Sequence, residues 1–99
     1  MRKVALPPVH PGEILRELYL SPLGISAGAL ARALAIPRTR IERLVSQTTS
    51  VTPDTALRLS KFFKTTPEFW MNMQVGYDLK IEAAAKKDEI AAIKELKAA

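Results

Sequence analysis

The stretch that decides the fold runs from Ser26 to Ser46 and reads SAGALARALAIPRTRIERLVS. Its apolar residues recur at helical spacing on both sides of a short connection, which predicts two helices joined by a tight turn. The positions expected to pack two crossing helices are all filled, by Leu30, Ala31, Leu34, Ile36, Ile41 and Leu44. This spacing is typical of a helix-turn-helix unit, which holds its second helix at the surface of the domain.

The turn of this unit contains one unusual residue. Ala35 stands where glycine would ease a positive φ. Alanine is tolerated at such a position if the turn uses ordinary φ angles. The second helix is then predicted to start at Pro37, directly after Ile36.

Prolines mark the predicted helix starts. Proline suits the first position of a helix, because its missing N–H would have no partner there. Four prolines fit this role: Pro11, Pro37, Pro53 and Pro67. Thr52 and Thr66 stand directly before two of them as N-cap hydroxyls. The run Pro22-Leu23-Gly24 is predicted to break the first helix.

Helical periodicity continues along the whole chain, and no run of four or more residues alternates as a strand would. The predicted helices cover 11–20, 26–34, 37–46, 53–63 and 67–82, and a short amphipathic helix follows over 86–98. The side chains outside the central stretch that are predicted to face the core are Ile14, Leu15, Leu18, Tyr19, Ala56, Leu59, Phe62, Phe63, Phe69, Trp70, Met73, Tyr77 and Ile81. We therefore predict an all-α fold of five to six short helices. We predict that a repressor-like helix-turn-helix domain with a dimer-forming last helix covers residues 1–82 and that an amphipathic helical tail covers 83–99.

Composition excludes several kinds of site. The 99 residues suffice for one domain. The chain has no cysteine, which excludes disulfides, a thiolate nucleophile and Cys-based metal sites, and its single histidine excludes His-pair zinc motifs. No catalytic set can be assembled around one histidine, so we expect neither an enzyme nor a metal or cofactor site. His10 is expected to cap or abut the first helix.

The charge is uneven along the chain. The formal net charge is +5, and residues 1–50 carry +4 of it, with seven basic and three acidic residues. A positive field in the first half points there for a polyanionic partner. Asp54 and Arg58, four residues apart, predict only a modest surface ion pair. Neither a signal peptide nor a membrane span is evident, so no membrane partner and a cytoplasmic location are expected.

The second helix of the central stretch presents cations. With Ile41 and Leu44 buried, its outward residues are Arg38, Thr39, Glu42, Arg43 and Ser46, and Arg40 lies at the flank. Arginine can bridge O6 and N7 of guanine, and threonine can contact a base amide or a thymine methyl group. The first turn of such a helix enters the groove, so Arg38 and Thr39 are the best candidates for reading bases, followed by Arg43.

Neighbouring polar residues are candidates for phosphate contacts. Ser26, with the amides of its helix behind it, is placed to hold a phosphate. Gln47, Thr48 and Thr49 are candidates for contacts with the DNA backbone. The alternative is an ordinary solvated face on which Glu42 balances one arginine. The charge, the filled apolar positions and the outward arginines together favour binding of double-stranded DNA.

Three further motifs resemble a known family. They are HPGEIL at 10–15, TPDTALRL at 52–59 and TPEFWMNMQ at 66–74. With the central stretch, they resemble the HigA antitoxin family, also described as VapI-like, within the Xre/Cro-type helix-turn-helix group. The resemblance covers about residues 5–82, and the PGEIL and TPEFW segments are its most specific parts.

The resemblance implies a function in a type II toxin–antitoxin system. Members of the family are usually homodimers that bind palindromic operators in their own promoter and repress the operon. They also neutralise a HigB-type toxin, an RNase that cuts mRNA on the ribosome. Carried over by position, the recognition helix is Pro37 to Ser46, with Arg38, Thr39, Arg40 and Arg43 facing DNA.

The sequence departs from the family pattern in two places. Ala27-Gly28 follows Ser26 where members often have Gln, and Gln47-Thr48-Thr49 stands in place of a Gly-Lys-Arg-type loop. Fewer phosphate contacts predict weaker operator binding with a flatter salt dependence. Two alternatives therefore stay open: a toxin-binding module with weak or lost DNA binding, and a stand-alone transcriptional regulator.

Overall fold

The computed structural model describes residues 8–97, and this part of the chain contains helices and no strands. In chain order the elements are α1 (Pro11–Ile14), the π-helical η1 (Leu15–Leu20), α2 (Ser21–Leu23), α3 (Ala27–Leu34), α4 (Arg38–Val45), α5 (Pro53–Phe63), α6 (Pro67–Ala85) and α7 (Lys87–Ala91). The first three elements follow one another without a break and form one rod, so the prediction of five to six helices is confirmed. Over the described residues, no helix combines the length and apolarity needed to span a membrane.

The first rod is longer than predicted, because Pro22 does not break it. An α-helix would require an N–H at Pro22 for the carbonyl four residues back, and proline has none. The rod winds as the π-helical η1 up to Leu20, with the N–H of Ser21 donating to Arg16 O, five residues back. Pro22 itself lies in the first turn of α2, where a missing N–H is tolerated. The chain turns only at Gly24, in the left-handed region at φ 64°. The prediction that Leu18 faces the core was wrong, since its side chain is 62% exposed.

The core lies between the first rod, α3, α4, α5 and the beginning of α6. Its buried apolar members are Leu15, Leu20, Leu30, Ala31, Leu34, Ile41, Leu44, Val51, Ala56, Leu59 and Trp70. Trp70 is fully buried and donates its indole N–H to Thr65 Oγ1 at 2.9 Å. Phe62 and Phe69 are 41% and 38% exposed, so their prediction as core residues was wrong. Each is the immediate neighbour of a packed aromatic, Phe63 or Trp70, and a helix turns adjacent side chains about 100° apart.

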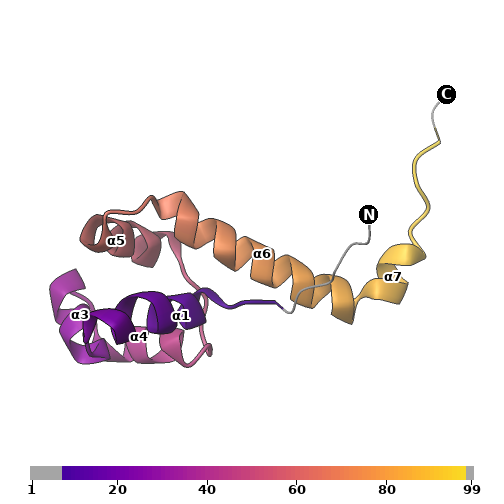
Figure 1. Cartoon of the computed structure of the whole chain (residues 1–99). Coiled ribbons are helices and arrows are strands. Elements are labelled where there is room, and N and C mark those ends of the chain that lie inside the picture. The colour runs from indigo at the N-terminus through magenta and orange to yellow at the C-terminus, as the bar shows by residue number, and fades with distance from the viewer. Residues whose placement is uncertain (1–7, 98–99) are drawn as a thin grey trace.

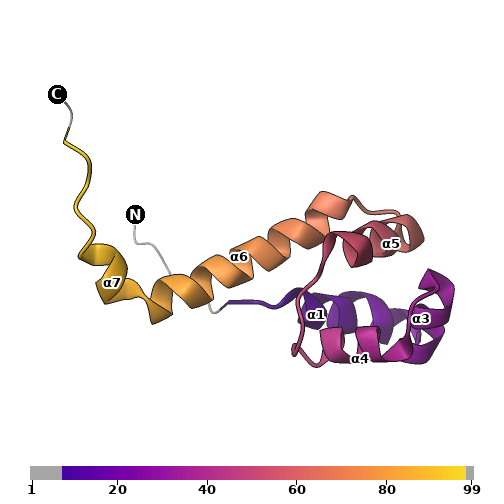
Figure 2. The same cartoon turned by 180° about the vertical axis from the view of Figure 1, so that it is seen from behind.

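The helix α6 begins on the bundle and then leaves it. Figures 1 and 2 show its second half extending away from the other helices, with α7 at its far end. Only Trp70 and Gln74 are buried on this helix. Ile81, predicted to face the core, is exposed because, among the described residues, the bundle of α1 to α5 does not extend along the second half of α6. The molecule is accordingly elongated, with extents of 56 × 29 × 23 Å.

The C-terminal amphipathic helix is shorter than predicted. Only Lys87–Ala91 is helical, whereas the sequence suggested a helix over 86–98. Residues 94–97 have no regular structure, and residues 98–99 lie outside the described part. A helix of this length needs a packing surface, and Ile90, Ile93 and Leu96 are exposed.

Candidate nucleic-acid interface

The helices α3 and α4 form the predicted helix-turn-helix. Ser26 caps α3 as expected, because its Oγ accepts a hydrogen bond from the N–H of Ala29 at 3.1 Å. Ala35 ends α3 in the left-handed region, at φ 57° and ψ 45°. The turn therefore uses the positive φ that alanine disfavours, and not the ordinary angles that would accommodate it. Pro37 is extended and precedes α4, so its predicted place as the first helical residue was wrong.

The other predicted helix starts are confirmed. Pro11, Pro53 and Pro67 each begin a helix. The hydroxyl of Thr52 caps α5 and that of Thr66 caps α6, each accepting from the backbone N–H three residues on. The start of α5 at Pro53 ends the loop that follows α4. The first turn of α5 then lies next to α4, where Arg40 reaches Asp54.

The position of α4 is set from two sides. Ile41 and Leu44 bury its inner face against the core. On the other side α1 approaches so closely that a Cβ on Gly12 would lie 1.8 Å from the carbonyl oxygen of Leu44. Only glycine fits this contact, because any side chain would collide with backbone rather than with a movable group. The helix α4 is thus held firmly enough to present its outer face in a defined orientation.

His10 links α1 to the loop that follows α4. Its Nδ1 accepts a hydrogen bond from the N–H of Gly12 at 2.9 Å, so it caps α1 as expected. Its ring packs edge-on against Tyr77, with ring centroids 4.9 Å apart. Burial lowers the pKa of the His10 imidazole, and a hydrogen bond with the backbone of Thr49 and the charge of Asp78 oppose this shift. The neutral ring therefore ties the start of α1 to the loop beside α4.

The outer face of α4 is exposed, as the sequence predicts. Arg38, Thr39, Arg40 and Arg43 are all exposed. Arg38 Nε donates to Glu42 Oε2 at 3.0 Å, so Glu42 does balance one arginine. Such an exposed pair contributes little and leaves the guanidinium free to change partner.

The polar residues after α4 play two different parts. The hydroxyls of Ser46 and Thr48 donate to the carbonyl oxygen of Arg43 at 3.0 and 3.1 Å, and thereby cap the C-terminus of α4. Gln47 is exposed and lies in the left-handed region at φ 64°. Ser46 and Thr48 are thus partly committed to the helix end, whereas the side chain of Gln47 is accessible to a ligand.

A groove runs between α4 and the first turn of α5. Its volume is about 500 Å³, and it is lined by Pro37, Thr39, Arg40, Arg43, Thr49, Ser50, Thr52, Asp54 and Thr55. Sequence reasoning placed the α4 side of this groove among the site residues but missed Ser50, Thr52, Asp54 and Thr55. The sequence signal for these residues was the polar run from Ser46 to Ser50, which follows α4 and leads to the capped start of α5. Two guanidinium groups and several hydroxyls suit this groove to an anion.

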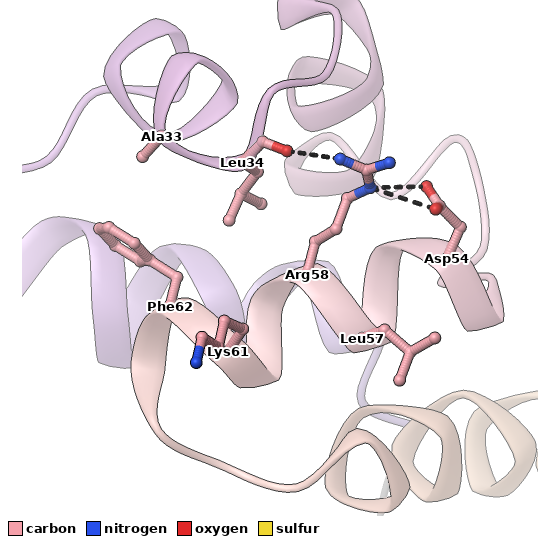
Figure 3. A pocket seen from close by; sticks show the side chains of 7 residues that line it. All are labelled: Ala33, Leu34, Asp54, Leu57, Arg58, Lys61 and Phe62. Atoms are coloured by element: carbon pink, nitrogen blue, oxygen red, sulfur yellow. Dashed lines mark hydrogen bonds and ion pairs between the residues drawn. The ribbon is translucent and has the colours of Figure 1, made fainter.

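Asp54 connects the groove to the helix-turn-helix. Its carboxylate accepts from Arg40 on α4 and from Arg58 one turn further along α5. The hydrogen bonds from Arg58, and then those from Arg40, lower the pKa of Asp54 below its ordinary value. Arg58 also donates to the carbonyl oxygen of Leu34, the last residue of α3, at 2.8 Å (Figure 3). The expected pair of Asp54 with Arg58 therefore belongs to a network across three helices.

These features define the class: a repressor-type helix-turn-helix protein whose second helix carries exposed arginines. The helix-turn-helix family matches residues 15–70. Virulence-associated protein I of Dichelobacter nodosus is 48% identical over 85 residues, which cover 86% of this chain and 79% of that protein. A HigA-family addiction module antidote protein from Coxiella burnetii has the same fold, with a TM-score of 0.87 and 43% identity over 92% of this chain and all of that one.

A second solved structure carries DNA. It is the antitoxin HigA of Pseudomonas aeruginosa with the higBA promoter, with a TM-score of 0.88 and 40% identity, covering 91% of this chain and 99% of that chain. The chain belongs to the HigA (VapI-like) antitoxin family, within the Xre-type helix-turn-helix group.

Proposed function

We propose that this chain is the antitoxin of a type II toxin–antitoxin system that binds operator DNA in its own promoter. The observation that carries the proposal is the exposed, arginine-bearing face of α4, held in place by α1 and α3. The family relative from Pseudomonas aeruginosa, which was solved with its promoter, supports it. The helix α4 then enters the major groove, and its first turn lies closest to the base edges.

The contacts divide into base reading and phosphate binding. Arg38 and Thr39 read bases from the first turn of α4, and Arg43 reads one turn further on. Ser26, the groove beside Arg40 and the loop at Gln47 and Thr48 hold the DNA backbone. Arg38 gives up an exposed partner on α4 itself when it engages a guanine, at little cost in free energy.

The exposed apolar side chains of α6 support operator binding as a homodimer. On this helix Val75 and Leu79 lie one turn apart and are 50% and 65% exposed. Apolar side chains repeated along one face of a helix favour contact with another protein surface. A second copy in that position would place two α4 helices symmetrically, as a palindromic operator requires.

Neutralisation of a HigB-type mRNA-cleaving toxin is the second part of the proposal. It rests on membership of the HigA family and not on a surface identified in this chain. Co-expression with the protein encoded beside it, followed by co-purification and a growth assay, tests this part separately. A complex that forms while promoter binding is lost favours a toxin-binding module. Promoter binding with no toxic neighbour favours a stand-alone regulator.

Electrophoretic retardation of a fragment of its own promoter tests DNA binding. We expect retardation at low salt, and loss of the retarded band on substitution of Arg38→Ala with Arg43→Ala. The matched control is Lys87→Ala with Lys94→Ala, which removes the same charge from exposed positions on α7 and after it, at a distance from α4. Equal weakening by both double variants, or no retardation of the unchanged chain at low salt, contradicts the proposal.

A further inference from the structure

Asp54 is shared by two arginines from different helices. Its Oδ2 accepts from Nη1 of Arg40 on α4 at 2.5 Å, and both of its oxygens accept from Nε of Arg58 at 3.1 Å. Arg58 is itself anchored, because its Nη1 donates to the carbonyl oxygen of Leu34 (Figure 3). Asp54 is therefore held by two bonds to a fixed arginine and by one bond to an arginine on the DNA-facing helix.

The ion pair between Arg40 and Asp54 lies on the groove between α4 and α5. Both residues line this groove, and their side chains are 42% and 53% exposed. A carboxylate oxygen on a guanidinium takes the same place as a phosphate oxygen, since both are anionic acceptors of its N–H groups. Asp54 and a phosphate therefore compete for Arg40.

The rest of the network stays in place when Arg40 leaves Asp54. Asp54 keeps both hydrogen bonds from Arg58, so its carboxylate does not become unpaired. Arg58 keeps its bond to Leu34, so α5 stays attached to the end of α3. Within residues 8–97, the interaction given up is one exposed ion pair, which belongs to the weakest kind of salt bridge.

We propose that Arg40 exchanges Asp54 for a DNA phosphate when the chain binds DNA, while Arg58 retains Asp54. The proposal rests on the DNA binding proposed above and assigns Asp54 a role that the sequence did not suggest. Asp54 acts as an internal competitor: it makes no contact with DNA, and it occupies Arg40 at the groove until a phosphate replaces it. The strength of this competition sets how tightly the groove holds the backbone, whatever the base sequence.

Fluorescence anisotropy over a range of salt concentrations tests the exchange. The variants are Asp54→Asn, Arg40→Gln and the two combined, measured on a promoter fragment and on an unrelated duplex. We expect Asp54→Asn to tighten binding to both duplexes about two- to fivefold, as removal of one weak competitor predicts. In the Arg40→Gln background the same substitution should have no effect. Arg40→Gln alone should flatten the slope of log affinity against log salt by about one unit, as for one lost phosphate contact.

A matched control separates the exchange from a general charge effect. Asp88→Asn removes one negative charge from the exposed face of α7, far from the groove, and should leave affinity nearly unchanged. Circular dichroism checks that each variant is folded. An unchanged salt slope in Arg40→Gln, or an equal gain from Asp54→Asn with and without Arg40, overturns the exchange alone. If the unchanged chain binds no DNA at any salt concentration, the proposed function fails, and the exchange fails with it.

Discussion

Substitution of Gly12 by alanine should force α1 away from α4 and thereby destabilise the chain. The added Cβ would lie 1.8 Å from the carbonyl oxygen of Leu44 and 2.8 Å from its carbonyl carbon. Both are backbone atoms of α4, so no rotamer change relieves the collision, and the two helices must separate by roughly 1 Å. The neighbours leave little room for this, because Leu15 and Leu44 are buried on either side.

The size of the effect follows from that geometry. Overpacking of a core costs about 1–3 kcal/mol when side chains can adjust. Because the obstacle here is backbone, we expect the upper end of this range, about 3 kcal/mol. For a domain of this size, that corresponds to a fall in Tm of about 12–24 °C. Promoter affinity should fall as well, because the carbonyl of Leu44 also accepts from the N–H of Gln47, and the loop moves with it.

Gly76→Ala is the matched control. A Cβ at Gly76 would meet nothing within 4 Å, and the residue lies inside α6. Replacing an interior helical glycine by alanine stabilises by about 0.5–1 kcal/mol, so this variant should melt several degrees higher than the unchanged chain. Thermal unfolding followed by circular dichroism compares the two. A Gly12→Ala chain that melts within about 3 °C of the unchanged chain would refute the steric argument.

Three other perturbations have defined outcomes. Ala35→Gly should raise the free energy of unfolding by about 1 kcal/mol in urea titration, because Ala35 sits at φ 57°; an unchanged midpoint would contradict this. Gln74→Leu should lower it by about 1–3 kcal/mol, because the buried Oε1 accepts from the N–H of Val51 at 2.8 Å; a neutral result would mean that water replaces the side chain. For His10 the folded pKa lies below the ordinary 6.5, so the unfolded chain takes up the proton first. Stability should therefore be full above about pH 6.5 and fall as the pH drops through the folded pKa, and His10→Gln should show a flatter profile between pH 7 and 5.

The parts of the fold that the sequence predicts are those set by neighbouring residues. Proline at the first helical position and threonine before it act within one turn, so the bounds of α5 and the start of α6 came out correctly. The burial of Leu30, Leu34 and Ile41 follows from helical periodicity in the same way.

The remaining features depend on residues that are distant in sequence or on local strain. The helix α6 has the composition of a packed helix along its whole length, but the bundle covers only its beginning, and Ile81 is therefore exposed. The π-helical stretch before Pro22 shifts which residues face inward, and a periodicity of 3.6 does not describe it. The strained turn at Ala35 is tolerated because the packing of α3 against α4 outweighs its cost.

The residues of the candidate interface also divide into those set by neighbours in sequence and those set by packing between distant segments. The sequence identified the cations of α4 from their spacing, because exposure on a helix follows from which face is buried. It did not identify the partner of Arg40, since Asp54 lies fourteen residues further on and meets it only through the packing of α5. The pairing of Asp54 with Arg58, in contrast, was visible as a separation of four residues along one helix.

The net charge of the chain overstates the field that α4 presents to DNA. Arg38 is paired with Glu42 and Arg40 with Asp54, and within residues 8–97 only Arg43 of the three arginines on α4 has no ion pair. General attraction to any duplex is weaker when cations are already neutralised, because it depends on the number of phosphates they neutralise. In the proposed complex, Arg38 and Arg40 exchange weak exposed partners for a guanine edge and a phosphate, which are stronger acceptors. Internal pairing therefore lowers attraction to any duplex, and under the proposed function Arg38 recovers its share only where a guanine edge lies within reach, so a chain with few cationic loop residues can still favour its own operator.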